Sequence, residues 1–467
     1  MKLYTINLKD NVAINLEHNK PIKYGHKIAL KDIKKGEFVY KYGEIIGVAS
    51  KNIKKGEWVH SHNLKSHLSE KIKYQYKPNF KIKYKDEHLF FYGFKHSENR
   101  IGIRNNIYII PTVGCINGVV NKIKAGVLSS HLGSIDNIVA INHQFGCSQI
   151  GDDHSNFKYF LANLALNPNA SYVLFVGLGC ENNQIDGIKQ ILNKEENKHI
   201  KYLICQEAKN EVEEGIKIVK DFIKKASKFK RVKVPLSKIV VGLKCGGSDA
   251  LSGITANPLV GKVCDRLILN KASTILTEVP EMFGAEQSLM NKCINKNIFN
   301  KYVNLINDFK DYFLKSGFPI YENPSPGNKE GGITTLEEKS LGCITKGGCS
   351  PIVDILSYCE RVKKSGLNIL EGPGNDLIAT SVLSSAGAHL ILFTTGRGTP
   401  YSSFVPTLKI STNDLLDKNK SHWIDFNAYK NDSDKLFNLI LKTVNGKYKC
   451  KQEDNIEIAY FKKGVTL

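Results

Sequence analysis

Short apolar segments that end in glycine or cysteine recur along the chain after about residue 100, and they constrain its fold more than any other feature. Examples are NIYIIPTVG, SYVLFVGLG and AHLILFTTG, the similar apolar segment STILTEV lies among them, and helical stretches such as NFKYFLANLAL separate them. Strands that are apolar on both faces belong to parallel sheets covered by helices. The alternation therefore predicts an α/β fold with parallel strands.

The stretch KCGGSDALSGITANP, residues 244–258, follows one such strand and contains almost no side chain that could fill a core. Ligands of open α/β sheets bind just beyond the carboxyl ends of the strands. Its hydroxyl and amide groups suit a polyhydroxylated ligand, because each buried hydroxyl needs a hydrogen-bond partner. The candidates for binding such a ligand are Ser248, Asp249, Thr255 and Asn257.

A short internal repeat marks a separate N-terminal domain. DIKKGEFVYKYG (32–43) is echoed by NIKKGEWVHSHN (52–63), and each copy predicts a turn followed by an alternating strand. Two such units predict a small, mostly β domain with pseudo-symmetry. The lysine-rich stretch that follows has weak periodicity and predicts a linker. We therefore expect a β domain at 1–66, a linker at 67–98, and an α/β region in two halves at 99–230 and 231–467.

Histidines gather in the second copy of this repeat. Alternation along a strand places His60 and His62 on the same face. Two imidazoles at that spacing can chelate a metal or bind an anion, and the alternative is a solvated strand face. His26 would join them if the strands pair.

The net charge of +21 raises the question of nucleic-acid binding. Only six of the 66 basic residues are arginine, and the lysines are scattered, which is typical of a composition bias rather than of a binding face. Only residues 71–85, KIKYQYKPNFKIKYK, interleave aromatic residues with lysines. We therefore expect no nucleic-acid and no membrane partner. Without a secretory signal or a spanning apolar segment, the sequence predicts a soluble cytoplasmic protein.

The scarce arginines are informative by their positions. Where lysine is the default cation, a retained arginine marks a place that needs a planar, bidentate fork for a carboxylate or phosphate. Arg100, Arg104 and Arg397 all lie in glycine-rich segments.

Eleven cysteines occur without a CxxC pair, which argues against a disulfide framework and against a structural zinc module. Four of them stand where predicted strands stop: Cys115, Cys147, Cys180 and Cys245. If these strands are parallel, the four thiols share the carboxyl edge of a sheet. They would either bind iron or zinc, an iron–sulfur cluster included, or form a weakly polar wall around a substrate, with His143 nearby as an acid or base.

The chain contains a series of long motifs in the order FYGFKHSENRIGIRNNIYIIPTVGC, NHQFGC, VGLGCENNQI, KCGGSDALSGITANPLVG, TEVPEMFGAE, SPGNKEGGITTLEEKSLGCITKGG, GPGND and TTGRGTP. In these motifs the chain resembles the altronate and galactarate dehydratase family, and VHSHN in the N-terminal repeat resembles the SAF-type β-clip domain of these enzymes. The resemblance implies metal-dependent removal of water from a sugar acid to give a 2-keto-3-deoxy acid. The implied cofactor is a divalent metal, Fe²⁺ first and Mn²⁺ second, with an iron–sulfur cluster as the alternative.

This chemistry gives the candidate residues their roles. A base must remove the proton beside the carboxylate while a cation stabilises the enediolate and an acid assists departure of the hydroxyl. We assign the metal to His26, His60 and His62, with the four strand-end thiols as the alternative set. The catalytic candidates are His143 as general base, Arg104 and Arg397 for the carboxylate, and Lys339 and Glu281. The substrate-binding candidates are Ser248, Asp249, Thr255, Asn257, Lys329 and Asn375.

The sequence features do not all favour the same substrate. GPGND (372–376) and FVPTLKIST (404–412) resemble the galactarate branch, whereas the overall length and the continuous N-terminal domain favour the altronate branch. We expect D-altronate as substrate, galactarate as the first alternative and a small sulfonated hydroxy acid, cleaved by a sulfo-lyase, as the second. A homo-oligomer is compatible with the sequence.

Overall fold

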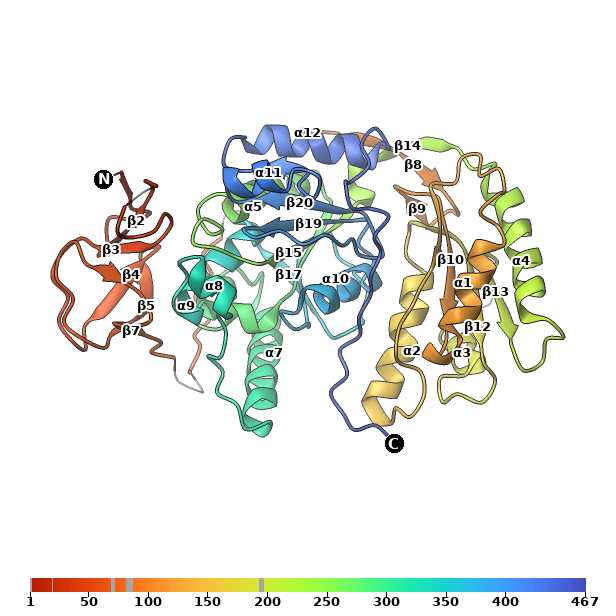
Figure 1. Ribbon diagram of the computed structural model, residues 1–467, viewed down its shortest axis with the longest axis horizontal. Helices are drawn as coiled ribbons and strands as arrows, with labels where there is room; N and C mark the ends of the chain where they lie inside the picture. Colours follow the sequence, from red (N-terminus) through yellow and green to blue (C-terminus); the bar gives the residue numbers. More distant parts are fainter. Residues whose placement is uncertain (1, 19, 69–71, 81–86, 193–196) are drawn as a thin grey trace.

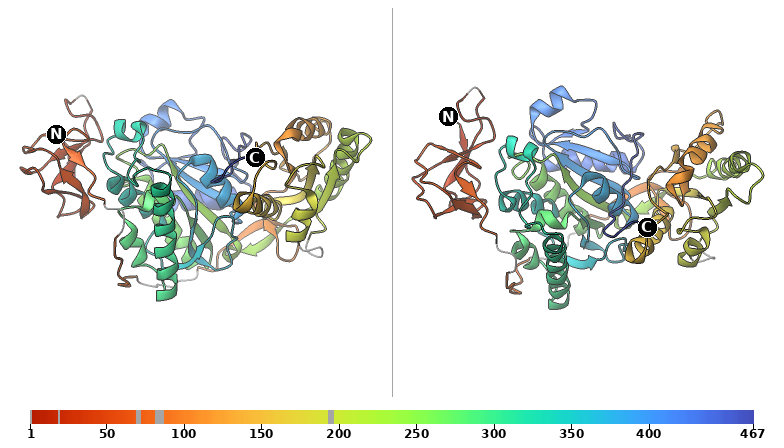
Figure 2. Two further views of the ribbon diagram at one scale, coloured as in Figure 1. Left: turned by 90° about the horizontal axis from the view of Figure 1, so that it is seen from below. Right: turned by 60° about the horizontal axis from the view of Figure 1, so that its bottom comes forward.

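The computed structural model describes residues 2–18, 20–68, 72–80, 87–192 and 197–467. Figure 1 shows three bodies in a row, with the N-terminal β domain at one end and the α/β unit of β10 to β13 at the other. The large sheet of the C-terminal half lies between them, and the views in Figure 2 agree. The expected fold class, a β-clip domain followed by an α/β region with parallel sheets in two halves, is confirmed.

The N-terminal domain consists of two small antiparallel sheets that follow the internal repeat. The equivalent glycines Gly36 and Gly56 adopt φ angles of 86° and 85°, and an Ile33–Ile53 bridge joins the two copies. The first sheet has the order β1 (Leu3–Tyr4), β2 (Val12–Asn15), β3 (Lys27–Ala29) and β6 (Trp58–Val59). The second has the order β4 (Phe38–Lys41), β5 (Glu44–Ala49) and β7 (Leu64–Lys65).

The unit at the opposite end is a four-stranded parallel sheet covered by helices. Its strand order is β11 (Asn137–Ala140), β10 (Asn106–Pro111), β12 (Ala170–Gly177) and β13 (Ile200–Ile204). Its helices are η1 (Gly114–Ile116), α1 (Asn117–Ala125), α2 (Gly151–Ala165), α3 (Ile185–Ile191) and α4 (Glu211–Ala226). A separate antiparallel sheet contains β14 (Arg231–Pro235), β8 (Phe90–Lys95) and β9 (Ile101–Gly102). The stretch expected to be a linker therefore contains a paired strand.

The central body is a seven-stranded parallel sheet. Its strand order is β17 (Ile352–Leu356), β18 (Gly366–Leu370), β16 (Ser273–Leu276), β15 (Val240–Gly246), β19 (Leu390–Thr395), β20 (Thr407–Ser411) and β21 (Phe426–Asn427). The α-helices around it are α5 (Ala256–Leu269), α6 (Glu286–Met290), α7 (Lys296–Lys315), α8 (Pro326–Glu330), α9 (Leu336–Cys343), α10 (Asp376–Ser385), α11 (Asp414–Asn419) and α12 (Ser433–Val444). The 3-10 helices are η2 (Leu236–Lys238), η3 (Val279–Met282) and η4 (Ile344–Gly347).

The order of this sheet locates the site. From β15 the chain moves to β16 on one side, and β19 later pairs with β15 on the other side. The strand order therefore reverses between β15 and β19, and ligands of open α/β sheets bind at such a switch point, beyond the carboxyl ends of the strands. β15 is almost wholly buried, so its apolar residues fix the strand in the core and leave its end at Cys245 and Gly246 to face the site.

The aromatic and lysine-rich stretch 71–85 lies partly outside the described residues. Within the described part, Tyr74 donates to the Glu286 carboxylate at 3.2 Å and Tyr76 to the Cys293 carbonyl at 3.0 Å. These two aromatic side chains therefore pack on the central body. Among the described residues no helix combines the length and the hydropathy that a membrane crossing requires.

Candidate active site

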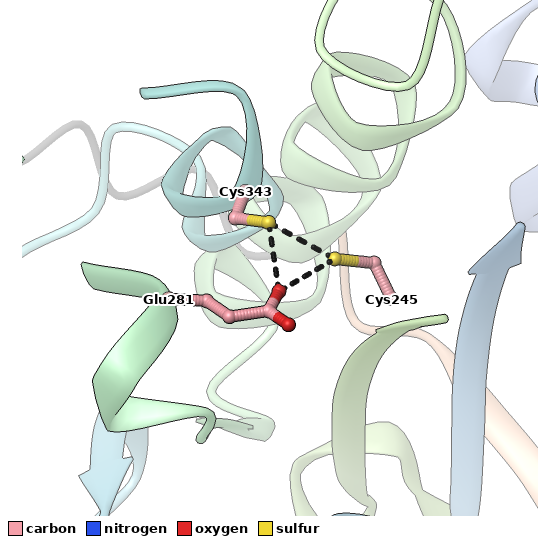
Figure 3. A group of neighbouring side chains, drawn as sticks. All are labelled: Cys245, Glu281 and Cys343. Carbon is pink, nitrogen blue, oxygen red and sulfur yellow. Dashed lines mark hydrogen bonds between the residues drawn. The ribbon is translucent and has the colours of Figure 1, made fainter. Parts of the chain in front are cut away.

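Two thiols and a carboxylate converge at the end of β15. The sulfur atoms of Cys245 and Cys343 lie 3.1 Å apart, and the Glu281 Oε2 atom lies 3.6 Å from the first and 3.1 Å from the second. Figure 3 shows the three side chains pointing toward one another from β15, η3 and the end of α9. All three residues are buried.

Lysines surround this triad and set its charge. Lys346 donates to the Cys245 sulfur at 2.9 Å, and Lys339 contacts Glu281 Oε1 at 2.8 Å. The hydrogen bond with Cys343, aided by the Lys346 ammonium, lowers the pKa of the Cys245 thiol, whereas the same hydrogen bond and burial raise the pKa of Cys343. Burial opposes the charge of Glu281, but Lys339 and the neighbouring lysines hold its pKa at about 2. Glu281 is therefore an ionised carboxylate at neutral pH.

Glu278 contacts the lysines next to the triad and the backbone of Cys245. Its carboxylate pairs with Lys244 and, at 3.1 Å, with Lys346, and it accepts from the Cys245 backbone N–H at 3.1 Å. The residue has φ 72° and ψ 52°, a left-handed conformation that is costly for a residue other than glycine. Lys244 also lies 3.0 Å from Asp376, so one buried ammonium connects Glu278 with the start of α10.

A cavity of about 670 Å³ opens onto the triad. Its walls include Cys245, Glu281, Lys339, Asn375 and Asp376. One side is polar, with amide and hydroxyl groups of residues 322–328, and the other is formed by aromatic rings of α7 and the C-terminal segment. The sequence thus predicted four side chains that share one cavity, namely Cys245, Glu281, Lys339 and Asn375.

The triad is consistent with a divalent metal. Two thiols and a carboxylate can together bind a divalent metal, and no other group of three His, Cys, Asp or Glu ligand atoms lies as close together among the described residues. Metal ligands must be deprotonated. The lowered pKa of Cys245 and the pKa of about 2 of Glu281 favour this state, whereas the raised pKa of Cys343 means that this thiol would have to lose its proton when a metal binds.

The expectation that four strand-end thiols share one edge is wrong. Cys115, Cys147 and Cys180 follow strands of the four-stranded sheet and are exposed, whereas Cys245 ends β15 of the seven-stranded sheet and is buried. Both sheets have parallel strands, so the local pattern is the same, but it does not determine which strands become neighbours. The partner of Cys245 is Cys343, which ends a helix.

His26 and His60 come together but not as a metal site. Their rings stack with centroids 5.3 Å apart, and their Nε2 atoms face the carbonyls of Glu330 and Lys329 at 3.1 and 2.8 Å. Burial lowers the pKa of both imidazoles. The backbone of residues 329–330 occupies the positions that a metal would need, so these histidines attach the N-terminal domain to the catalytic region.

His62 does not share a strand face with His60. β6 ends at Val59, because the Asn63 side chain accepts from the His60 N–H at 2.9 Å and folds the chain into a turn. His60 is buried and His62 is exposed. The strand-face prediction for this pair is therefore wrong.

His143 and Arg104 lie outside the cavity of the triad. His143 donates from Nε2 to the Pro111 carbonyl at 2.8 Å, and its Nδ1 accepts from the Phe145 N–H at 3.2 Å. Arg104 forms a bidentate ion pair with Glu453, with 2.9 Å between its Nη2 and Oε2. The roles of general base and carboxylate receptor that the sequence suggested for them would need a rearrangement.

The polar residues that follow β15 mostly stabilise the turn itself. Asp249 accepts from Thr412 at 2.9 Å, Thr255 donates to the Leu251 carbonyl at 2.9 Å, and Asn257 donates to the Gly342 carbonyl at 3.0 Å. The Ser248 hydroxyl is buried and has no hydrogen-bond partner in the described part of the chain. Within this set Ser248 alone keeps a polar atom available.

The loop around α8 forms the rim of the site. Arg397 contacts Glu330 at 3.1 Å and the Gly327 carbonyl at 3.4 Å, so its guanidinium sits beside this loop. Lys329 offers its carbonyl to His60, and Asn375 caps α10 by accepting from the Ile378 N–H at 3.1 Å. Of these three predicted site residues, Asn375 lines the cavity, whereas Arg397 and Lys329 are not among its lining residues.

The comparisons with known proteins cover nearly the whole chain. Family models match in three consecutive parts, described as "Altronate/galactarate dehydratase SAF domain" at residues 5–67, "D-galactarate dehydratase/Altronate hydrolase, second domain" at 93–227, and "D-galactarate/Altronate dehydratase, C-terminal" at 236–466. An altronate dehydratase of Bacillus subtilis (strain 168) is 47% identical over 97% of this chain and 94% of its own length.

The chain belongs to the altronate/galactarate dehydratase family. An altronate dehydratase of Escherichia coli (strain K12) is 46% identical over 98% of this chain and 94% of its own length. The L-threo-forming galactarate dehydratase of the same strain is 31% identical over 93% and 88%. The chain is therefore a hydro-lyase that acts on a sugar acid, as the motifs predicted.

Sequence reasoning missed Cys343, Lys346, Glu278, Lys244 and Asp376, which complete the site of this dehydratase. All five lie inside motifs quoted for the resemblance, in CITKGG, TEV, KCGG and GPGND. The motifs themselves could have indicated these residues, because CITKGG, KCGG and GPGND each place a charged residue close to glycines. The motifs did not indicate that residues about a hundred positions apart meet in one cluster.

Proposed function

We propose that this member of the family dehydrates D-altronate with a divalent metal, Fe²⁺ in the first place and Mn²⁺ in the second. The observation that carries the proposal is the triad of Cys245, Glu281 and Cys343 at a polar cavity beyond the carboxyl end of β15. Similarity favours altronate over galactarate, because the altronate dehydratases are 46–47% identical and the galactarate dehydratase 31%. The proposed enzyme is cytoplasmic, and its partner is the small sugar acid.

Cys245, Glu281 and Cys343 would hold the metal. A divalent ion there supplies Lewis-acid stabilisation of the negative charge that develops on the substrate carboxylate when the neighbouring proton leaves. Lys346 donates to the Cys245 sulfur and, together with the hydrogen bond from Cys343, favours the thiolate form of Cys245. Glu278 in turn forms an ion pair with Lys346. Metal binding by the two cysteines therefore depends on Lys346 and Glu278 as well as on the short distance between the two thiols.

Other side chains of the cavity bind the substrate carboxylate, remove the proton and bind the sugar hydroxyls. A base takes the proton from C2, and the hydroxyl that leaves C3 combines with a proton to form the water that is lost. The resulting enol then tautomerises, losing its O–H proton and gaining one at C3, to give the 2-keto-3-deoxy acid. Lys339 is the cation that receives the carboxylate, since its ammonium lines the cavity and is held by Glu281 and Asn323. Asp376 is the base, because its carboxylate lines the cavity and Lys244 orients it at 3.0 Å. The amides of Asn323 and Asn375 face the sugar hydroxyls.

Anaerobic turnover of the purified chain tests the assignment. The protein is freed of metal, then incubated with D-altronate, galactarate or 3-sulfolactate, with and without Fe²⁺ or Mn²⁺, and 2-keto-3-deoxy acid, pyruvate and sulfite are quantified. We expect a 2-keto-3-deoxy acid from altronate only when Fe²⁺ or Mn²⁺ is present. Product from galactarate alone, sulfite from sulfolactate, or full turnover without any metal would overturn the corresponding part of the proposal.

A matched pair of cysteine variants tests the metal ligands. Cys343→Ala removes one soft donor, and we expect turnover to fall more than about 100-fold together with loss of stoichiometric iron. Cys293→Ala makes the same change at a buried cysteine outside the triad, and it should retain both iron and turnover within about threefold. Iron content is measured by atomic emission, independently of activity. An unchanged iron content in Cys343→Ala would exclude Cys343 as a ligand.

A further inference from the structure

A second cavity, of about 590 Å³, lies between the α/β unit of β10–β13 and the central body, and it shares no lining residue with the cavity of the triad. Its lining comes from the β8–β9 turn, from the start of β12 and the segment before it, from the segments before β13 and β14, and from the loop between β17 and β18. The residues that matter for its chemistry are Arg100, Arg361, Lys198, His96, Tyr172 and Phe229.

Among the described residues, positive charge prevails in this cavity. Two of the six arginines of the chain line it, and the only acidic side chain among its described lining residues, Glu98, is mostly exposed and pairs with Lys95 at 2.6 Å. Within the described part of the chain, Arg361 donates to neutral acceptors, the carbonyls of Asn163 and Leu166 at 3.1 and 3.2 Å. In the described part of the chain, neither guanidinium lies within ion-pair distance of a carboxylate.

Arg100 is the less satisfied of the two. Its Nε and Nη1 atoms are buried and have no hydrogen-bond partner among the described residues, and its Nη2 reaches the Ser171 carbonyl at 3.5 Å. Burial and the nearby positive charge of Arg361 lower the pKa of Arg100 to about 10. A guanidinium placed in this way costs free energy unless an anion completes its hydrogen bonds.

We propose that this cavity binds a small organic anion with a carboxylate or phosphate group, held by the fork of Arg100 and by Arg361. A guanidinium presents two parallel N–H donors that match these groups, which a lysine does not. Lys198 adds a third positive charge at the cavity, and the rings of Tyr172 and Phe229, 6.2 Å apart between centroids, offer an apolar wall to the carbon part of the ligand. The site is separate from the dehydration chemistry and does not depend on the proposed substrate.

Calorimetric titration of the full chain tests this site, with inorganic phosphate, pyrophosphate and citrate as probes at low ionic strength. We expect at least one probe to bind at one anion per chain. Arg100→Gln should weaken that binding by about tenfold or more, because a charge-assisted hydrogen-bond pair is lost. Lys198→Gln should weaken it less, by about threefold, because it removes a charge without a bidentate contact. Arg266→Gln, at a partly exposed arginine that pairs with Glu87 and Asp434, should leave it unchanged.

Three outcomes would overturn the proposal. The first is that none of the probes binds. The second is binding that Arg100→Gln and Lys198→Gln leave unchanged. The third is binding that disappears in Lys339→Met but not in the Arg100 variant, which would place the anion in the cavity of the triad. If Arg100→Gln fails to fold, Lys198→Glu tests the proposal in its place, because a reversed charge at the cavity must weaken anion binding. Unchanged binding in that variant would overturn the proposal.

Discussion

His143 is a buried imidazole whose two nitrogens are both used inside the protein, by the Pro111 carbonyl and the Phe145 N–H. Burial lowers its pKa from 6.5 to about 4. Between these two values the unfolded chain binds a proton that the folded chain does not, so the stabilisation is complete above pH 6.5 and is lost as the pH falls to about 4. The difference of about 2.5 pKa units corresponds to about 3 kcal/mol.

This linkage predicts a change in the pH dependence of stability. His143→Gln keeps a donor and an acceptor but does not titrate, so the free energy of unfolding should fall less steeply between pH 6.5 and 4 than in the unmodified protein. His62→Gln, at an exposed histidine, should leave the slope as it is. The measurement is urea unfolding at a series of pH values. Equal slopes in the His143 variant and the unmodified protein would mean that His143 titrates normally in the folded state.

At the scale of elements, the end of β15 has no room for a side chain. A Cβ atom on Gly246 would lie 2.5 Å from Asp376 Oδ2 and 2.5 Å from a ring carbon of Phe393. The strand must therefore end in glycine for the α10 carboxylate to reach the cavity. This explains in part why small residues follow a buried strand at this place in the sequence.

Two glycine-to-alanine variants test the role of this strand end. Gly246→Ala should displace Asp376 or Phe393, lower stability by about 1–3 kcal/mol and reduce turnover at least about tenfold. Gly118→Ala, in α1, meets nothing within 4 Å and should be neutral or stabilise by about 0.5–1 kcal/mol. Thermal unfolding and the 2-keto acid assay provide the two readouts. A Gly246→Ala enzyme with normal turnover would show that the position of Asp376 is not needed.

At the scale of the whole molecule, one buried carboxylate joins the N-terminal domain to the catalytic region. Glu338 of α9 contacts Lys27 at 2.7 Å and Lys41 at 2.8 Å, and none of these side chains is more than 1% exposed. Burial alone would raise the pKa of Glu338, but Lys27 and Lys41 hold it at about 2. The next residue of the same helix is Lys339, so the domain contact and the site share one helix.

Breaking this contact should affect both stability and activity. Glu338→Gln leaves two buried lysines without their carboxylate, although Lys27 keeps its hydrogen bonds to the Gly332 carbonyl and the Thr334 hydroxyl. We expect a loss of about 3–5 kcal/mol of stability and a marked fall in turnover. Glu44→Gln makes the same change at an exposed position of β5 and should shift stability by less than about 0.5 kcal/mol. Differential scanning calorimetry with parallel turnover assays measures both effects. Similar melting profiles for the two variants would refute a structural role for Glu338 between the domains.

The sequence determined the local parts of this protein. Hydrophobic periodicity predicted β10, β12, β15, β16 and β19, because a strand buried on both faces must be apolar along its length. The repeat predicted the small β domain, and the first residues of the stretch singled out after β15, Cys245 to Gly247, line the cavity. The motifs identified the family, and four predicted residues, Cys245, Glu281, Lys339 and Asn375, line one cavity.

Only the tertiary structure decided which of these parts meet. Strand order separates Cys115, Cys147 and Cys180 from Cys245, and the end of α9 places the Cys343 sulfur 3.1 Å from that of Cys245 instead. His26 and His60 form hydrogen bonds with the backbone carbonyls of residues 329–330, which lie far along the chain. Hydrophobic periodicity predicts whether a residue is buried, but it does not predict which residue of another element it contacts. Long-range contacts between buried polar groups depend on the order and packing of all the elements, and no single stretch of sequence contains that information.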